Sequence, residues 1–206
     1  MVIDGIYYAL ALTAGGAVVW YLTKPWWSLP FFAISLFCLY FFRDPERGIP
    51  DGPVAVSPAD GKVVGIRPLG GPSQTDAPAR ISIFLNIFDV HVNRAPIAGT
   101  ITKVDYTKGQ FLVASREVAS SHNERNTVTI DGGDTNVSFA QIAGLIARRI
   151  VFNKQTGDHV AKGERVGLIK FGSRVDVFLG PEWEIAVKPG DRVQGGSSVL
   201  ARRKQV

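Results

Sequence analysis

One glycine–serine bond, Gly172-Ser173, is a point at which this chain could react with itself. The serine hydroxyl could attack the carbonyl of the preceding glycine, which has no Cβ to obstruct the approach, and convert the amide to an ester. β-Elimination from that ester would leave dehydroalanine, and hydrolysis would then give a pyruvoyl group and ammonia. Such a chain would cut itself between residues 172 and 173 and make its own electrophilic cofactor.

A second sequence offers the same chemistry, because Ser197 and Ser198 follow Gly196. Gly-Ser is a common turn pair, so each of these serines taken singly is better explained as part of a turn. The residues alone leave the choice between Ser173 and the Ser197-Ser198 pair open.

The attack also needs a base, and the chain has three histidines, His91, His122 and His159. Exposed loop polarity accounts for His122 in the stretch SSHNERNT and for His159 in a Gly-Asp turn. His91 lies in the mainly apolar stretch IFLNIFDVHVNRAP, beside Asp89 and Arg94. A histidine there is usually a satisfied core residue, unless an acid and a nucleophile converge on it. We take His91 as the candidate base.

Two nearly uncharged runs precede these residues, from Gly5 to Leu22 and from Pro25 to Phe42. Each approaches the length of about 20 residues that crosses a bilayer, and aromatic residues flank the turn between them. We expect residues 1–42 to form a helical membrane hairpin that either spans the bilayer or lies in one leaflet. Because Arg43 follows directly, the positive-inside tendency places the remaining domain on the cytoplasmic side of the cell membrane.

The rest of the chain has the pattern of a β protein. Residues 43–56 contain three prolines and predict an extended linker, and residues 57–206 contain short β-branched runs separated by glycine. The segments TGDHVAKGERVGLI and PGDRVQGGSSVLA share a Gly-Asp turn followed by an apolar run. The pattern predicts a mainly β fold, a small barrel-sandwich or β-sandwich with turns like those of biotinyl and lipoyl domains. The single methionine, Met1, argues against a carrier function.

Composition narrows the function further. The 206 residues include 46% hydrophobic residues and carry a net charge of +5, which suits an anionic partner such as a membrane. The basic residues are scattered and show no stacking motif, so we expect no nucleic acid. A single cysteine, Cys38, excludes a disulfide framework and a thiolate cage, and we expect an inert thiol and no metal site.

Four segments in order give the chain a resemblance to a known family: SPADGKV, FDVHVNRAP, NERN and KGERVGLIKFGSRVDVF. Together with the apolar hairpin and FFRDPER, they resemble the short prokaryotic form of phosphatidylserine decarboxylase, a pyruvoyl-dependent enzyme, over nearly the whole chain. The resemblance favours Ser173 over Ser197 and Ser198 as the cleavage serine. It implies a large piece, 1–172, and a small piece, 173–206, that remain together as a heterodimer.

The resemblance also implies an Asp-His-Ser relay for self-cleavage, which carries over to Asp60, His91 and Ser173. Two positions depart from the family pattern. Arg174 stands where the family usually has threonine, and Arg94 stands where the second histidine of a His-x-x-His pair is common. We keep His91 as the base because an arginine stays protonated.

The reaction implied by the resemblance is decarboxylation of phosphatidylserine to phosphatidylethanolamine through a Schiff base to the pyruvoyl group formed from Ser173. His91 would return the proton to the α-carbon. Another serine-headed lipid, such as an archaeal ether lipid, would react in the same way. A membrane-anchored barrel-sandwich adaptor without enzymatic activity is the alternative of another class, and a homo-oligomer is compatible with either.

Overall fold

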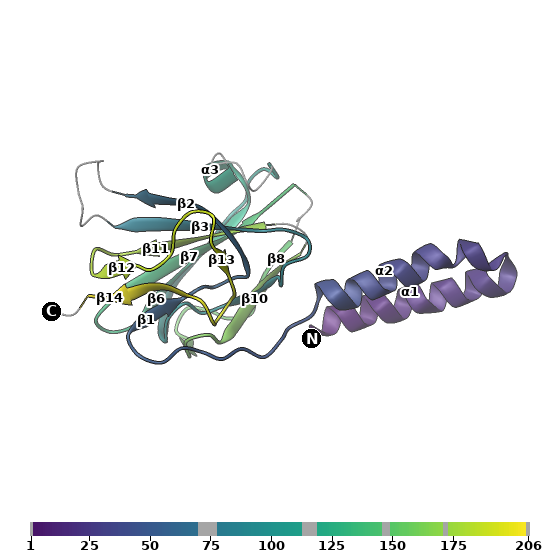
Figure 1. The fold of residues 1–206 in the computed structure, drawn as a ribbon, viewed down its shortest axis with the longest axis horizontal. Coiled ribbons are helices and arrows are strands. Elements are labelled where there is room, and N and C mark those ends of the chain that lie inside the picture. The colour runs from purple at the N-terminus through teal and green to yellow at the C-terminus, as the bar shows by residue number, and fades with distance from the viewer. Residues whose placement is uncertain (1, 70–77, 113–118, 146–148, 171–172, 205–206) are drawn as a thin grey trace. The chain divides into compact units, whose positions relative to one another are not determined.

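The computed structural model describes residues 2–69, 78–112, 119–145, 149–170 and 173–204. The chain divides into two compact units, Met1–Glu46 and Arg47–Val206. The first unit is helical and the second consists almost entirely of strands (Figure 1).

The helical unit is a hairpin of two apolar helices, α1 (Ile3–Leu22) and α2 (Leu29–Phe41), joined through a short 3-10 turn, η1 (Pro25–Trp27). The Ser35 side chain links the helices by donating to the carbonyl oxygen of Ala9 at 3.0 Å. By its length and apolar composition α1 can cross a membrane, with a mean hydropathy of 1.4, whereas α2 is shorter. This composition supports association with a membrane.

The second unit has three sheets. Eight strands form one curled sheet in the order β13-β2-β3-β11-β7-β6-β5-β9, and two three-stranded sheets have the orders β1-β14-β12 and β4-β10-β8. The strands are β1 (Val54–Val56), β2 (Gly61–Pro68), β3 (Ala79–Leu85), β4 (Val92–Arg94), β5 (Gly99–Thr107), β6 (Arg125–Asp131), β7 (Asn136–Ala143), β8 (Arg149–Phe152), β9 (His159–Val160), β10 (Arg165–Lys170), β11 (Ser173–Leu179), β12 (Trp183–Ile185), β13 (Arg192–Val193) and β14 (Val199–Arg203). A short helix, α3 (Ala119–His122), precedes β6. The prediction of a mainly β domain preceded by apolar helices is confirmed.

The strand pairings repeat within this unit as two similar halves. The outer half consists of β1–β3 and β11–β14, and the inserted half consists of β4–β10. The strand order of the large sheet is symmetric about its centre, between β11 and β7. In this symmetry β13 corresponds to β9, β2 to β5, β3 to β6 and β11 to β7. The two small sheets match in the same way. The second unit is therefore a pseudo-twofold arrangement in which one half interrupts the chain of the other.

Backbone hydrogen bonds confirm the match residue by residue. Val56 donates its N–H to the carbonyl of Pro96, and Arg94 donates in turn to the carbonyl of Pro58, both at 2.9 Å. Gly61 and Gly99 begin matched strands with φ of 153° and 155°. A Cβ on Gly61 would collide with the carbonyl of Phe84, and one on Gly99 would collide with that of Asp131. Both positions therefore require glycine for the same reason.

The two Gly-Asp turns noted in the sequence are also matched. Gly157 and Gly190 have φ of 98° and 103°, and the carboxylates of Asp158 and Asp191 accept a backbone N–H three residues upstream, both at 2.9 Å. The strands β9 and β13 follow these turns and pair with β5 and β2. The turns therefore start equivalent strands at the two ends of the large sheet.

The insertion determines where Ser173 lies. In the inserted half, β6 and β7 form a hairpin, with Asp131 opposite Asn136. In the outer half, β3 and β11 pair in the same way, with Leu85 opposite Ser173, but the whole inserted half lies between them in the sequence. Ser173 thus begins a central strand where the chain re-enters the outer half.

Candidate active site

Ser173 lies fully buried at the start of β11. It has no solvent-exposed surface, and its Oγ has no hydrogen-bond partner among the residues that the structure describes. In β11 it lies two residues before Val175, which belongs to the hydrophobic core, so its side chain points to the core side of the sheet. A buried hydroxyl without a partner is costly, and such groups often have a functional reason. Phe171 and Gly172, on the other side of the predicted cleavage point, lie outside the described residues.

Thr135 is the counterpart of Ser173 in the inserted half. The residues after the matched Gly61 and Gly99 pair with Phe84 and Asp131, so the next residues, Leu85 and Gly132, correspond to each other. Ser173 lies opposite Leu85, and the carbonyl of Thr135 accepts the N–H of Gly132. The Thr135 hydroxyl accepts a hydrogen bond from the indole N–H of Trp183 at 3.0 Å and donates one to the Glu182 carboxylate. The fold therefore allows a hydroxyl at this position to be fully hydrogen-bonded. Ser173, at the equivalent position of the outer half, lacks such partners among the described residues.

The pseudo-twofold match also relates Asp60 and His91 to Ser173. Their counterparts are Ala98, which precedes Gly99 as Asp60 precedes Gly61, and Pro53, which precedes β1 as His91 precedes β4. Pro53 and His91 make the same contact, since their carbonyls accept N–H groups of Arg203 in β14 and Ile169 in β10. A cavity of about 250 Å³ is lined by all three counterparts, Pro53, Ala98 and Thr135. By the pseudo-twofold match, Asp60, His91 and Ser173 are the corresponding positions of the outer half.

His91 is buried and held in one tautomer. Its Nδ1 lies 2.9 Å from the carbonyl oxygen of Asp89. A carbonyl oxygen can only accept, so Nδ1 carries the proton, and in the neutral form of the ring the acceptor nitrogen is Nε2. This is the arrangement that a general base requires. The tautomer is determined by a backbone group, which the sequence analysis did not find.

Asp60 is held by two donors. Its Oδ2 accepts a hydrogen bond from the Arg47 guanidinium, and its Oδ1 accepts one from the backbone N–H of Gly195, both at 2.7 Å. Burial raises the pKa of the Asp60 carboxyl above its ordinary value. The Gly195 N–H and Arg47 oppose that rise, and the negative charge of Asp89 adds to it.

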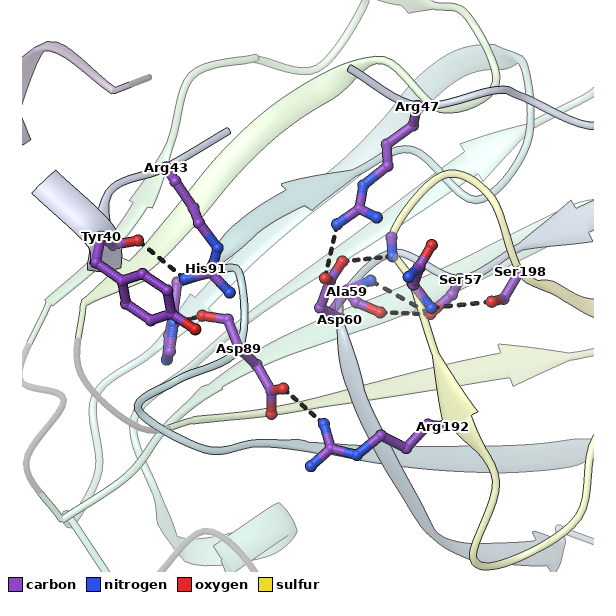
Figure 2. Close-up of polar contacts among 12 residues, drawn as sticks. Tyr40, Arg43, Arg47, Ser57, Ala59, Asp60, Asp89, His91, Arg192 and Ser198 are labelled. Atoms are coloured by element: carbon purple, nitrogen blue, oxygen red, sulfur yellow. Dashed lines mark hydrogen bonds and ion pairs between the residues drawn. The ribbon is translucent and has the colours of Figure 1, made fainter. Parts of the chain in front are cut away.

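Asp89 forms the second carboxylate of this region. Its Oδ1 is paired with Arg192 at 2.8 Å, and its Oδ2 accepts the backbone N–H of Asn86 at 2.9 Å. Figure 2 shows the Asp60–Arg47 and Asp89–Arg192 pairs together with the bond from His91 to the Asp89 carbonyl. Arg47, Asp89 and Arg192 belong to the site although the sequence analysis did not assign them a role.

Arg174, the residue that departs from the family pattern, forms a buried ion pair with Asp176. Both side chains are 1% exposed, and the Arg174 Nε lies 2.6 Å from the Asp176 Oδ1. Arg174 also donates to the hydroxyl of Ser82 at 2.6 Å, and Ser120, in α3, donates to Asp176 at 2.8 Å. Because side chains alternate along a strand, this cluster lies on the opposite side of the sheet from Ser173. It anchors the start of β11, and the spacing of Arg174 and Asp176 could have indicated it.

A chain of buried amide groups runs beside the same strands. The Asn126 side chain donates to Gln141 Oε1 at 3.1 Å, and the Gln141 side chain donates to Asn93 Oδ1 at 2.9 Å. Gln141 lies opposite Val175 in the β7–β11 pairing. These bonds join β6, β7 and β4 next to the strand that begins with Ser173. The segments FDVHVNRAP and NERN of the sequence analysis supply Asn93 and Asn126.

The other candidates have structural surroundings. The hydroxyl of Ser198 accepts the backbone N–H of Gln194 at 2.9 Å, as part of the turn that contains Ser197. His122 and His159 are exposed. Within the described part of the chain, no cluster of three or more His, Cys, Asp or Glu side chains could hold a metal ion.

The fold and this site define a class of protein. It has an apolar helical hairpin and a β domain, and the β domain holds a buried serine at the start of a central strand, a buried histidine and two carboxylates. Comparison with known proteins identifies the family. Residues 34–201 match the model of the phosphatidylserine decarboxylase family, and the chain belongs to that family.

Three relatives are all described as phosphatidylserine decarboxylase proenzymes. The chain is 66% identical to that of Solibacter usitatus over 98% of its own length and 97% of the relative's. It is 43% identical to that of Oleidesulfovibrio alaskensis over 95% of its length and 91% of the relative's. For that of Neisseria meningitidis serogroup C the identity is 46%, over 86% and 68%. The resemblance stated from the sequence is confirmed.

Proposed function

We propose that the chain is a proenzyme that cuts itself between Gly172 and Ser173 and then decarboxylates phosphatidylserine to phosphatidylethanolamine. Family membership over nearly the whole chain supports the activity. One structural observation supports Ser173 as the serine that is cleaved. Its hydroxyl, at the start of a central strand, is buried and unsatisfied among the described residues.

For self-cleavage, His91 Nε2 accepts the proton of the Ser173 hydroxyl while Oγ bonds to the Gly172 carbonyl carbon. Breaking the carbon–nitrogen bond leaves an ester on Oγ and a free amine on Ser173. Loss of the Ser173 α-proton expels the Gly172 carboxylate and leaves a carbon–carbon double bond. Water then replaces the nitrogen, which leaves as ammonia. Asp60, near Asp89, makes the surroundings of His91 more negative and stabilises the imidazolium that forms.

The residues present fit a pyruvoyl group at position 173. The Oγ of Ser173 is buried and has no partner among the described residues, and the Arg174–Asp176 pair holds the next residue in the sheet. When formed, the group supplies a carbonyl that accepts the electrons released as carbon dioxide leaves. His91, protonated by then, can deliver a proton to the substrate α-carbon.

The substrate resides in a membrane, and the helical unit accounts for access to it. An α1 helix that can cross a bilayer would anchor the chain at the membrane of the cell, with the β domain on the cytoplasmic side. After cleavage, residues 173–206 would remain bound to residues 1–172, because β11 lies between β3 and β7, β13 pairs with β2 and β14 pairs with β1.

Two measurements on one preparation test this function. Intact-mass analysis of the purified protein should show a break between residues 172 and 173, with a pyruvoyl-blocked small chain. Incubation with phosphatidylserine in vesicles should give phosphatidylethanolamine and carbon dioxide. An active preparation that remains one intact chain, or that is broken at Gly196, would overturn the proposal.

A further inference from the structure

Large apolar side chains are exposed on both sides of the strand that begins with Ser173. Ser173 lies between Leu85, the last residue of β3, and Ala143, the last residue of β7. Phe88 and Leu145 follow these two strand ends and are 60% and 58% exposed. Both side chains are therefore presented at the edge of the sheet where the candidate nucleophile lies.

The Phe88 side chain is presented by a rigid turn. The side chain of Asn86 accepts the backbone N–H of Phe88 at 2.7 Å, and the carboxylate of Asp89 accepts that of Asn86 at 2.9 Å. Asp89 is held in turn by Arg192, and its carbonyl accepts the hydrogen bond from His91. The turn that exposes Phe88 is thus bonded directly to the candidate base.

Exposed basic side chains lie on strands that neighbour β3 and β7 at this end of the sheet or follow them in sequence. Arg149 is exposed and lies opposite Lys170, the last residue of β10, next to the predicted cleavage point. The Arg192 side chain is 65% exposed, and the exposed Lys62 lies opposite it in the β2–β13 pairing. The carboxylate of Asp89 is already paired with Arg192. Single exposed apolar residues are common on protein surfaces. Two exposed apolar residues next to a reactive site, together with exposed basic residues, have the composition of a surface that binds anionic lipid.

We propose that Phe88 and Leu145, with Arg149, Arg192 and Lys62, form a membrane-contact edge of the β domain that docks on an anionic bilayer. The two apolar side chains enter the interfacial region and the basic side chains bind lipid phosphates. The edge directs the Ser173 end of the sheet at the bilayer, so that a lipid headgroup reaches the site while its acyl chains stay in the membrane. The role of this edge in catalysis rests on the proposed lipid substrate. Its binding to the bilayer does not depend on that substrate.

The chain offers a direct probe, because Cys38 is its only cysteine. In the full chain carrying Cys38→Ser and Ser173→Ala, a single cysteine at Phe88 or Leu145 can be labelled with the fluorophore NBD. Leu69→Cys is the matched control, since Leu69 is 53% exposed but follows the far end of β2, away from Ser173. The proteins are reconstituted into phosphatidylcholine vesicles with or without phosphatidylglycerol.

Labels at positions 88 and 145 should shift their emission to the blue and be quenched by lipids that carry a shallow nitroxide, more strongly with phosphatidylglycerol. The label at position 69 should do neither. No quenching at 88 and 145 would show that only the helices bind the membrane, and equal quenching at all three positions would show that the β domain has no preferred edge. Either result would overturn the proposal. Because Ser173→Ala is inactive by design, this result is independent of catalysis, so it can stand even if no decarboxylation is ever observed.

A kinetic experiment tests the role of the edge in catalysis. Phe88→Ser with Leu145→Ser should raise the KM for phosphatidylserine in vesicles several-fold and leave the turnover of a soluble short-chain phosphatidylserine unchanged. Leu69→Ser should change neither. A loss of equal size on the vesicle and the soluble substrate would overturn the role of the edge in catalysis.

Discussion

Thr135 and Ser173 occupy equivalent positions in the two halves of the β domain, yet only the Thr135 hydroxyl is hydrogen-bonded within the described residues. The fold thus contains its own comparison for the proposed nucleophile. One half has a satisfied threonine before its strand, and the other has an unsatisfied serine.

Ser173→Ala should leave the chain uncut and inactive, because it removes the atom that attacks Gly172. Thr135→Ser should create no second cut after Asp134, since the equivalent place in the inserted half has Pro53 and Ala98 instead of His91 and Asp60. Ser197→Ala should mature normally. Intact mass measures all three variants, and a cut at residue 135 would show that strand position alone suffices.

His91→Ala should slow maturation by about 10²- to 10⁴-fold, the usual contribution of a positioned base. A time course of cleavage after synthesis at fixed temperature measures the rate. His159→Ala, which changes an exposed histidine, is the control. Maturation at the normal rate with a slow turnover would assign His91 to protonation of the substrate alone.

The pKa of Asp60 predicts the pH dependence of maturation. Burial raises this pKa, so the carboxylate becomes protonated at a higher pH than the value of about 3.9 for an ordinary aspartate. If the carboxylate is required, the rate falls as the pH drops through the raised pKa. Arg47→Gln removes a charge that lowers this pKa, and should therefore move the acid limb to higher pH.

Asp60→Asn should slow maturation and abolish this acid limb. The same substitution should change the pH dependence of stability. A carboxyl whose pKa is raised in the folded state holds its proton more tightly there, so its ionisation costs stability as the pH rises through the range between its unfolded and folded pKa values. Urea unfolding of Ser173→Ala with and without Asp60→Asn measures this difference. An unchanged pH profile would show that the Asp60 carboxyl does not titrate in this range.

Arg174→Gln should destabilise the uncut chain by about 3 to 5 kcal/mol, because it leaves the buried Asp176 carboxylate without its main partner. Adding Asp176→Asn should recover most of that loss, because the buried carboxylate that had lost its main partner is then removed. Lys103→Gln breaks an ion pair whose side chains are 68% and 54% exposed, and should cost about 0 to 1 kcal/mol. Urea unfolding in the Ser173→Ala background measures each value, and equal losses for Arg174→Gln and Lys103→Gln would contradict the anchoring role.

A chain that begins at Arg43 should still cleave itself if the helical hairpin serves only for placement. The β domain has its own core, so we expect it to fold, which circular dichroism can verify. Its activity on vesicles should fall while its cleavage persists. A folded but uncut domain would show that the helices help to build the active site.

The sequence was sufficient to predict the β fold, the apolar helices and the family, because these depend on residue types in order along the chain. It indicated the internal symmetry only at the two Gly-Asp turns, where both halves need the same backbone. Many other counterparts differ in type, as Thr135 and Ser173 do, so the full match is visible only in the strand pairings.

Two parts of the candidate site could not be read from residue types. The tautomer of His91 depends on a backbone carbonyl, and every residue has one. The hydrogen-bond partners of Asp60 are Arg47 and the backbone N–H of Gly195. Neither residue is its neighbour in sequence, and only the folded chain brings them next to Asp60. Arg174 departs from the family pattern, but its spacing of two residues from Asp176 on one strand is what indicates the buried ion pair between them.

The insertion of one half into the other has a consequence for the lifetime of the enzyme. After a cut at residue 172, β11, β13 and β14 would pair with strands of another chain, β3 and β7, β2, and β1, so neither product would contain a complete outer half. Refolding of an unfolded mature molecule would then require two chains to meet, and it would depend on their concentration. The rate of unfolding would set how long each molecule works, as in other proteins whose stability is kinetic. In dilute conditions, each mature molecule would unfold only once.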